Sequence, residues 1–242
     1  MQRSRTDTLA RVAVVALAVG AVVALLATPA AAQSVNRNAI DDLNEQLLYV
    51  ALPLVLFVEV TLVYALYRFR NNDDPRPTTK DSALEITWTA ATGVVLLFVG
   101  LSAFFVLANP YITPAAGQTA PAETADDAVE IEVVAYQWGW EFRYQGEDVT
   151  TQSKLVLPND RDVYFSLVTR DVIHSFYVPE LGLKQDIIPG ATTDARTRAT
   201  ETGEYTLYCA ELCGVGHTRM HGTVVVVSGE EYQDWLDEQR DG

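Results

Sequence analysis

A short stretch near the C-terminal end of the sequence concentrates side chains that bind soft metal ions. Two cysteines, a histidine and a methionine lie within 12 residues: Cys209, Cys213, His217 and Met220. Thiolate and thioether sulfur are soft ligands and imidazole also suits copper, whereas magnesium and calcium favour carboxylates. Gly214 and Gly216 let the backbone fold tightly enough to bring the histidine and the methionine back to the cysteines. The stretch therefore predicts a copper site.

Three other interpretations compete with copper. A disulfide between Cys209 and Cys213 would be common outside the cell. A zinc knuckle also uses thiolate and imidazole, but zinc does not favour a methionine ligand. In the third interpretation, Met220 and His217 are unrelated core and surface residues. The conjunction of all four side chains with a second imidazole, from His174 between two predicted strands, favours copper.

The number of sulfur ligands favours two copper ions over one. A one-copper blue site uses two histidines, one cysteine and a distant methionine, and this loop has one cysteine more. Two thiolates can each bridge two metal ions, so that one electron is shared and little rearrangement accompanies its transfer. No ligand position is left open, which suits an electron relay and not a substrate-binding catalyst.

The charge of the chain limits its partners. It has 32 acidic and 17 basic residues, a formal net charge of -15. Nucleic acid is excluded as a partner, because phosphate binding needs a basic face. Only three basic residues are lysines, and this acidic, lysine-poor composition favours a salt-adapted, halophilic source. The alternative is an ordinary acidic exported protein.

The first 32 residues have the features of a secretion signal. An uncharged apolar run from Val12 to Ala32 follows three arginines and ends in small residues. This pattern predicts a cleavable signal peptide over residues 1–32, cut after about Ala32. The alternative is a third membrane helix.

Two further apolar segments are long enough to span a bilayer. After an outer segment at residues 33–46, we predict transmembrane helices at 47–70 and 86–108. The connecting loop at 71–85 and its flank carry four basic residues, Arg68, Arg70, Arg76 and Lys80. Because basic residues concentrate on the cytoplasmic side, we expect a cytoplasmic loop and a two-pass protein of the plasma membrane. Everything after Ala108 then lies outside.

From residue 129 the periodicity becomes that of strands. Residues 109–128 are rich in Pro, Gly and Ala and are interpreted as a linker. Short apolar or alternating runs, separated by turn residues, lie at 129–136, 152–157, 162–168, 173–178, 204–209 and 220–227. This spacing predicts an all-β sandwich or barrel over residues 129–228. The acidic start of residues 229–242 predicts a capped C-terminal helix and tail.

The metal-binding loop resembles the CuA-binding pattern of the cytochrome c oxidase subunit II family, CxExCGxxHxxM, at every position from Cys209 to Met220. The likeness extends to Asp171-Val172-Ile173-His174 and the residues up to Lys184. It also includes Tyr136-Gln137-Trp138-Gly139-Trp140 and the two-helix hairpin, so that it covers about residues 45–228. It implies an all-β cupredoxin fold, a Greek-key sandwich, with a copper pair at one end.

The resemblance also implies a ligand set for a binuclear CuA centre. It consists of the thiolates of Cys209 and Cys213, the imidazoles of His174 and His217, the thioether of Met220 and the main-chain carbonyl of Glu211. The thiolates would bridge both ions, and each histidine would complete one of them. The carboxylate of Glu211 would instead reach a magnesium ion at the contact with subunit I.

Four residues outside the ligand set also invite functional interpretations. Trp138 matches the tryptophan through which electrons enter from the donor, whereas Trp140 is interpreted as a core aromatic. Glu85 resembles the family's glutamate at the mouth of a proton path into subunit I. Glu59 lies in the middle of a membrane segment, where ionisable groups are costly, and we expect it to face a polar group of a partner helix. His221 points away from Met220 along a strand and is not expected to be a ligand.

The function implied is that of the electron-accepting subunit of an aa3-like, proton-pumping haem-copper oxidase. The expected partners are oxidase subunit I, subunit III, the lipid bilayer, and an external donor that is cytochrome c or a halocyanin-like copper protein. No complete active site is expected on this chain, because it lacks haem ligands. The alternatives are a quinol oxidase subunit, which lacks the copper ligands, a stand-alone tethered copper carrier or chaperone, and nitrous-oxide reductase, which needs no membrane hairpin.

Overall fold

The computed structural model describes residues 33–114 and 128–241 of the 242-residue chain. The predicted signal peptide at 1–32 lies outside the described residues, as does most of the predicted linker at 109–128.

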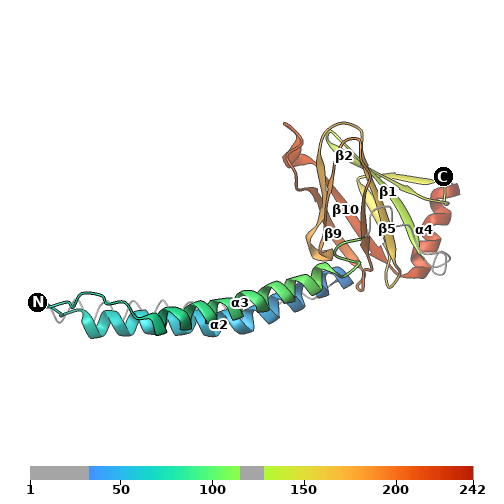
Figure 1. Ribbon diagram of the computed structural model, residues 1–242. Helices are drawn as coiled ribbons and strands as arrows, with labels where there is room; N and C mark the ends of the chain where they lie inside the picture. Colours follow the sequence, from blue (N-terminus) through green and yellow to red (C-terminus); the bar gives the residue numbers. More distant parts are fainter. Residues whose placement is uncertain (1–32, 115–127, 242) are drawn as a thin grey trace, which may run out of the picture. The chain divides into compact units, whose positions relative to one another are not determined.

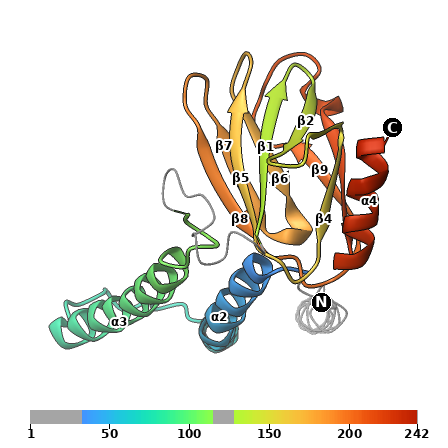
Figure 2. The same cartoon turned by 90° about the vertical axis from the view of Figure 1, so that its right-hand side faces the viewer.

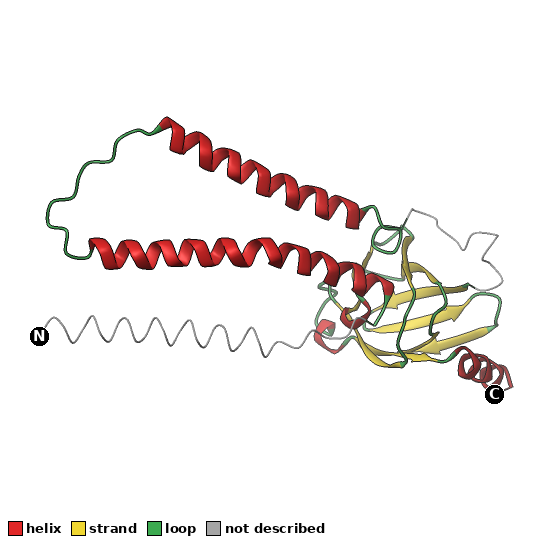
Figure 3. Ribbon diagram, turned by 90° about the horizontal axis from the view of Figure 1, so that it is seen from below, coloured by secondary structure: helices red, strands yellow, loops and turns green. Residues whose placement is uncertain are grey.

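Two long helices come first, named as in Figure 1: α2 (Val35–Phe69) and α3 (Ser82–Leu107). Each begins at a side-chain cap, because Ser34 accepts a hydrogen bond from the amide of Arg37 and Asp81 accepts one from the amide of Leu84. Both helices are long and apolar enough to cross a membrane, and Figure 3 shows them joined by one loop. α2 begins well before the apolar segment at residue 47, so most of the predicted outer segment is helical.

The residues after 128 form two five-stranded sheets. The first has the order β3-β2-β1-β5-β8, and the second has the order β4-β10-β9-β6-β7. The strands of the first sheet are β1 (Val129–Tyr136), β2 (Gly139–Tyr144), β3 (Val149–Gln152), β5 (Val163–Thr169) and β8 (Thr193–Thr197). Those of the second are β4 (Lys154–Pro158), β6 (His174–Val178), β7 (Leu183–Ile187), β9 (Gly203–Cys209) and β10 (His221–Val227).

The two sheets pack face to face, as Figure 2 shows, and aromatic rings fill the space between them. Trp140 of the first sheet contacts Phe176 of the second at a centroid distance of 5.8 Å, and Phe165 contacts the same ring at 5.5 Å. All three rings are fully buried. Edge-to-face and tilted ring pairs of this kind add to the stabilisation that burial provides. The predicted β-sandwich is therefore confirmed.

A C-terminal helix, α4 (Gly229–Asp241), closes the chain. Ser228 and Glu231 form a reciprocal capping box: the Ser228 hydroxyl accepts from the amide of Glu231, and the Glu231 carboxylate accepts from the amide of Ser228. Tyr232 and Leu236 are buried on one face of the helix, and Trp235 contacts the ring of Tyr144 edge-on. The helix thus covers one edge of the sandwich.

A buried polar cluster, which we call the clasp, joins the start of α2 to the β-domain. Its members are Ser34, Asn36, Tyr111, Asp162, Thr197, Arg196 and Arg198. Asp162 accepts hydrogen bonds from the Tyr111 hydroxyl at 2.6 Å and from both arginines. The Asn36 side chain donates to the carbonyl of Arg196 and accepts from the Thr197 hydroxyl. The clasp lies where β5 begins, whereas the predicted copper ligands lie beyond the other end of that strand.

Candidate metal centre

Three loops meet at the end of the sandwich opposite the clasp. They are the turn between β1 and β2 at 137–138, the segment before β6 at 170–173, and the loop between β9 and β10 at 210–220. β9 pairs with both β6 and β10, so that Phe176 lies opposite Cys209 and His221 lies opposite Tyr208. This pairing places the first residue of β6, His174, beside the last residue of β9, Cys209. The sheet therefore brings together residues that are 35 positions apart.

The loop after β9 folds back on itself through its own backbone. The amide of Cys209 donates to the carbonyl of Met220 at 3.1 Å, which closes the loop at its base. A 3-10 turn at His217–Arg219 returns the chain. Gly214 has φ +116°, a conformation that side-chain-bearing residues rarely adopt, so glycine is required there. The predicted role of the loop glycines is thus supported at this position.

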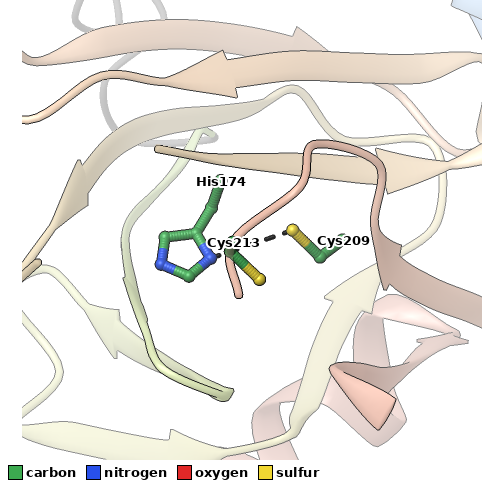
Figure 4. Close-up of side chains that lie close together, drawn as sticks. All are labelled: His174, Cys209 and Cys213. Carbon is green, nitrogen blue, oxygen red and sulfur yellow. Dashed lines mark hydrogen bonds between the residues drawn. The ribbon is translucent and has the colours of Figure 1, made fainter. Parts of the chain in front are cut away.

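All six predicted copper-binding atoms face a common space. The Sγ of Cys209 lies 3.8 Å from His174 Nδ1 and 3.1 Å from the carbonyl oxygen of Glu211. The Sγ of Cys213 lies 3.6 Å from His217 Nδ1 and 3.7 Å from Met220 Sδ. One donor atom each from His174, Cys209 and Cys213 lies within 4.8 Å of the other two, as in Figure 4. Each thiol thus lies beside one imidazole and one further weak donor, and His217 also interacts with Cys209.

The centre is buried, and its cysteines are not joined. His174 and Met220 are fully buried, Cys209 is 4% exposed and Cys213 is 2% exposed. Both cysteines are free thiols, so the competing disulfide interpretation is not what the structure shows. Soft sulfur and imidazole donors that converge in a buried space fit copper better than a hard cation.

The two thiols differ in acidity. Burial acts to raise the pKa of Cys209, but hydrogen bonds from His174 and from the backbone outweigh it and hold that pKa at about 6. Burial, and then the negative charge of Cys209, raise the pKa of Cys213 to about 12. Two thiolates side by side in a buried site repel each other, and a bound cation removes this penalty. Metal binding is therefore expected to release the proton of Cys213.

His174 is oriented by a carboxylate. Asp171 Oδ1 lies 2.9 Å from His174 Nε2, and Asp171 Oδ2 accepts a hydrogen bond from the amide of Gln137 at 2.7 Å. A neutral His174 that donates through Nε2 keeps its lone pair on Nδ1, the atom that faces Cys209. Sequence reasoning quoted Asp171 within a motif without giving it a role. The available signal was a carboxylate three residues before a ligand histidine.

Trp138 lies on the outside of the centre. Its indole Nε1 donates a hydrogen bond to the carbonyl of Cys213 at 3.2 Å, and the side-chain amide of Gln137 donates to the same carbonyl at 2.7 Å. The indole is 39% exposed, whereas Trp140 is fully buried in the core. Next to Trp138, Leu212 and Val215 project into solvent with 73% and 91% of their surface exposed. The centre is thus covered by an apolar, solvent-facing surface.

The remaining predicted residues lie away from the centre. Glu85 is in the first turn of α3, and Glu59 is an exposed residue in the middle of α2. The carboxylate of Glu211 accepts a hydrogen bond from the amide of Leu212 at 3.3 Å. His221 Nε2 lies 2.8 Å from the carbonyl of Thr218, and the residue is exposed.

Sequence comparisons place these features in a known family. Residues 21–106 match the model for cytochrome C oxidase subunit II, transmembrane domain, and residues 147–228 match that for its periplasmic domain. A probable cytochrome c oxidase subunit 2 of Rickettsia bellii is 31% identical over 80% of this chain and 76% of its own length. The cytochrome c oxidase subunit 2 of Cereibacter sphaeroides is 30% identical over 81% of this chain and 74% of its own length.

A further relative and one solved structure are similar over smaller parts. The cytochrome c oxidase subunit 2 of Alkalihalophilus pseudofirmus is 34% identical over 76% of this chain, which spans 53% of that relative. The solved periplasmic domain of cytochrome oxidase subunit II from Bradyrhizobium japonicum is 24% identical, with a TM-score of 0.45, over 53% of this chain and 96% of its own. Because both parts of the chain match subunit II models and relatives match most of its length, the chain belongs to the cytochrome c oxidase subunit II family.

Proposed function

We propose that this chain is the electron-accepting subunit of a proton-pumping haem-copper oxidase and that its six converging donors hold a binuclear copper centre. The observation that carries the proposal is the paired arrangement of the ligands. Cys209 has His174 and the Glu211 carbonyl beside it, and Cys213 has His217 and Met220. Two equivalent half-sites, each with one thiol, one imidazole and one weak donor, suit two metal ions better than one.

The residues of the chain determine what this centre does. When bound, a copper pair that shares one electron supplies one-electron transfer with little change in geometry. The thiolates of Cys209 and Cys213, Nδ1 of His174 and of His217, Met220 Sδ and the Glu211 carbonyl oxygen would hold the pair, with the last two as the weaker donors. Because the ligands lie on strand ends and on a hydrogen-bonded loop, the protein would hold them in place with little movement. No position remains for a substrate, which supports a relay.

Electrons are proposed to enter through Trp138 from a soluble donor. The indole contacts solvent on one side and the carbonyl of Cys213 on the other, so that it connects the surface to a bridging ligand. The exposed Leu212 and Val215 offer apolar contact around it. Residues 109–242 carry 23 acidic and 9 basic residues, a net charge of -14, which would attract a basic cytochrome c at low salt. Near 1 M salt the Debye length falls to roughly 3 Å, and a halocyanin-like copper protein becomes an equal candidate.

The membrane part and the acidic residues complete the proposal. The hairpin is placed in the plasma membrane with its basic loop inside and the β-domain outside, beside subunit I and subunit III. The signal peptide is removed after about Ala32. The Glu211 carboxylate contributes to a magnesium site at the contact with subunit I, and Glu85 lies at the mouth of a proton path into that subunit. A stand-alone copper carrier is disfavoured, because it needs only one anchor and because the paired helices match the subunit II transmembrane model.

Two histidines close together in the sequence provide a matched test: His217 at the start of the 3-10 turn and His221 at the start of β10. The full-length chain is purified in detergent, loaded with copper and compared with the His217→Asn and His221→Asn variants. We expect two copper ions per chain, a purple colour and an EPR signal from one electron shared by two copper nuclei. His217→Asn should lose this signal, and His221→Asn should keep it, because His221 is exposed and bonded to a carbonyl. A blue one-copper spectrum, or a Cys209–Cys213 disulfide in metal-replete protein, would contradict the proposal.

A further inference from the structure

Trp138 lies closer to the copper loop than a hydrogen bond alone requires. It is the second residue of the two-residue turn between β1 and β2, in which Tyr136 pairs with Gly139. Besides donating to the carbonyl of Cys213, its indole ring covers the backbone at Gly216. Gly216 is buried although it is in a surface loop. The ring and the glycine are therefore in direct van der Waals contact, 78 positions apart in the sequence.

Only a residue without a side chain fits under this ring. A Cβ atom at Gly216 would lie 2.3 Å from Cδ2 of Trp138 and 2.7 Å from both Cε3 and Cγ. Ordinary contact begins at 3.4 Å, so the ring or the loop would have to move by about 1 Å. The backbone of Gly216 has φ -96° and ψ 4°, a conformation open to other residues. The requirement for glycine here thus comes from the indole and not from the backbone angles.

The backbone on both sides is held in place, so the side chain of Trp138 is the part that can give way. The turn carrying Trp138 is fixed by the pairing of Ala135 with Trp140 and by the hydrogen bond from the Gln137 amide to Asp171. The loop is fixed by the bond from the Arg219 amide to the Gly216 carbonyl at 2.9 Å. A retreat of about 1 Å would stretch the 3.2 Å hydrogen bond to Cys213 beyond the range of hydrogen bonds.

We propose that Gly216 is a positioning residue for electron uptake: by carrying no side chain, it lets the indole of Trp138 lie on the loop and donate to the carbonyl of Cys213. Gly216 acts through Trp138, whose ring atoms are the nearest that a Cβ at Gly216 would meet. The route it secures runs from the exposed indole through one hydrogen bond into the residue whose sulfur bridges the proposed copper pair. The effect on electron uptake rests on the proposed function. The contact between Trp138 and Gly216 does not depend on copper.

The test uses the full-length chain labelled with ¹⁵N at its four tryptophans, first without copper. Trp138→Phe identifies the indole signal of Trp138. In Gly216→Ala we expect that signal to shift and its N–H to exchange as fast as a free indole, because the bond to Cys213 is lost. Gly229→Ala is the matched control: a Cβ there meets nothing within 4 Å, so the signal should stay unchanged. An unchanged Trp138 signal in Gly216→Ala would overturn the proposal, whether or not the chain binds copper.

The second readout uses the copper-loaded chain in the assembled oxidase. We expect Gly216→Ala to slow reduction by the donor roughly tenfold, since a misplacement of about 1 Å can cost up to ~100-fold, while the copper absorption stays the same. In a Trp138→Ala background, which removes all the ring atoms that a Cβ at Gly216 would meet, Gly216→Ala should have no further effect on the rate or on thermal stability. A changed copper spectrum would show that Gly216 shapes the ligand loop itself and would overturn the proposal. If Gly216→Ala slowed reduction equally in the presence and in the absence of Trp138, that result would also overturn the proposal.

Discussion

The β-domain has a cluster of polar side chains at each end, and the two clusters are satisfied in different ways. In the clasp, the Asp162 carboxylate receives hydrogen bonds from Tyr111, Arg196 and Arg198 at 2.6 to 2.9 Å. At the metal centre, two thiols and two imidazoles approach each other only to 3.6 and 3.8 Å. In the clasp, the negative charge of Asp162 is balanced by the arginines of the protein itself. At the second end, lone pairs converge on a space that a cation would fill.

The difference shows how a buried polar cluster can be assigned to structure or to function. A buried carboxylate with two arginines is compensated, and breaking it costs stability. Buried sulfur donors with one strongly raised pKa are not compensated, and they become so only when a metal binds. The clasp therefore belongs to folding and the metal centre to chemistry, and each can be damaged without the other.

The largest effect is expected from Cys213→Ser, which removes one of the two thiols proposed to hold the copper pair. Copper content should fall below two ions per chain, and the purple chromophore should disappear. Without copper, the free energy of unfolding should change by about 1 kcal/mol or less, as for a small buried substitution without a cavity. Thermal melts of the variant with and without copper measure both its copper binding and its stability, because a bound metal raises the melting temperature by mass action. A Cys213→Ser chain that keeps the full copper-dependent rise would remove Cys213 from the ligand set.

A smaller effect, on stability alone, is expected from Asp162→Asn. The substitution removes the negative charge that Arg196 and Arg198 face, and because the Arg198 side chain is 42% exposed, the loss should lie between the about 1 kcal/mol of a surface pair and the about 3 kcal/mol of a buried pair. Denaturant unfolding of the copper-free chain measures this loss. The copper content of the folded protein should be unchanged. Asp237→Asn is the control, since the side chain of Asp237 is 71% exposed and that of its partner Arg240 is 40% exposed, and such pairs contribute about 1 kcal/mol at most. Loss of copper on clasp damage would show that the two ends are coupled.

The smallest effect concerns pH. Burial acts to raise the pKa of Asp162, but hydrogen bonds from Arg198, Tyr111 and Arg196 outweigh it and lower that pKa below its usual value of 3.8. A carboxyl with a lowered pKa in the folded state stabilises the protein fully above pH 3.8, and this contribution is lost as the pH falls through the folded pKa. The copper-free chain should therefore lose stability more steeply below pH 4 than Asp162→Asn does. Unfolding curves between pH 6 and 3 test this, and parallel pH profiles would contradict it.

The sequence predicts the sandwich but not all of its strands. β1 alternates buried apolar and partly exposed polar residues from Val129 to Glu132, and β5 alternates buried and partly exposed residues from Phe165 to Val168. β2 carries Glu141 at a nearly buried position, where it pairs with Arg143 of the same strand and with Arg170, which is 29 positions away. β8, Thr193–Thr197, contains a single apolar residue and obtains its place from pairing with β5. Strands stabilised by distant partners carry no local signal.

The copper loop shows the same division within a single site. Cys209, Cys213, His217 and Met220 are recognisable from the sequence alone, because four donors on one short loop must lie near one another whatever the fold. The spacing of cysteine, glycine and histidine is set by the order of residues in the chain alone. The same is true of the length of the apolar segments in the two membrane helices. These features determined the kind of metal, the membrane anchor and the family.

Other parts of the site depend on contacts between segments far apart in the sequence, and only the tertiary structure decided them. The pairing of β6 with β9 brings His174 to Cys209, and Asp171 then selects which nitrogen of His174 faces the sulfur. The place of Trp138 on Gly216 and the closure of the clasp by Asp162 are likewise long-range contacts. The geometry of these contacts follows from the way the two sheets and their loops pack. Packing decides which distant side chains become neighbours, and this cannot be read from spacing along the chain.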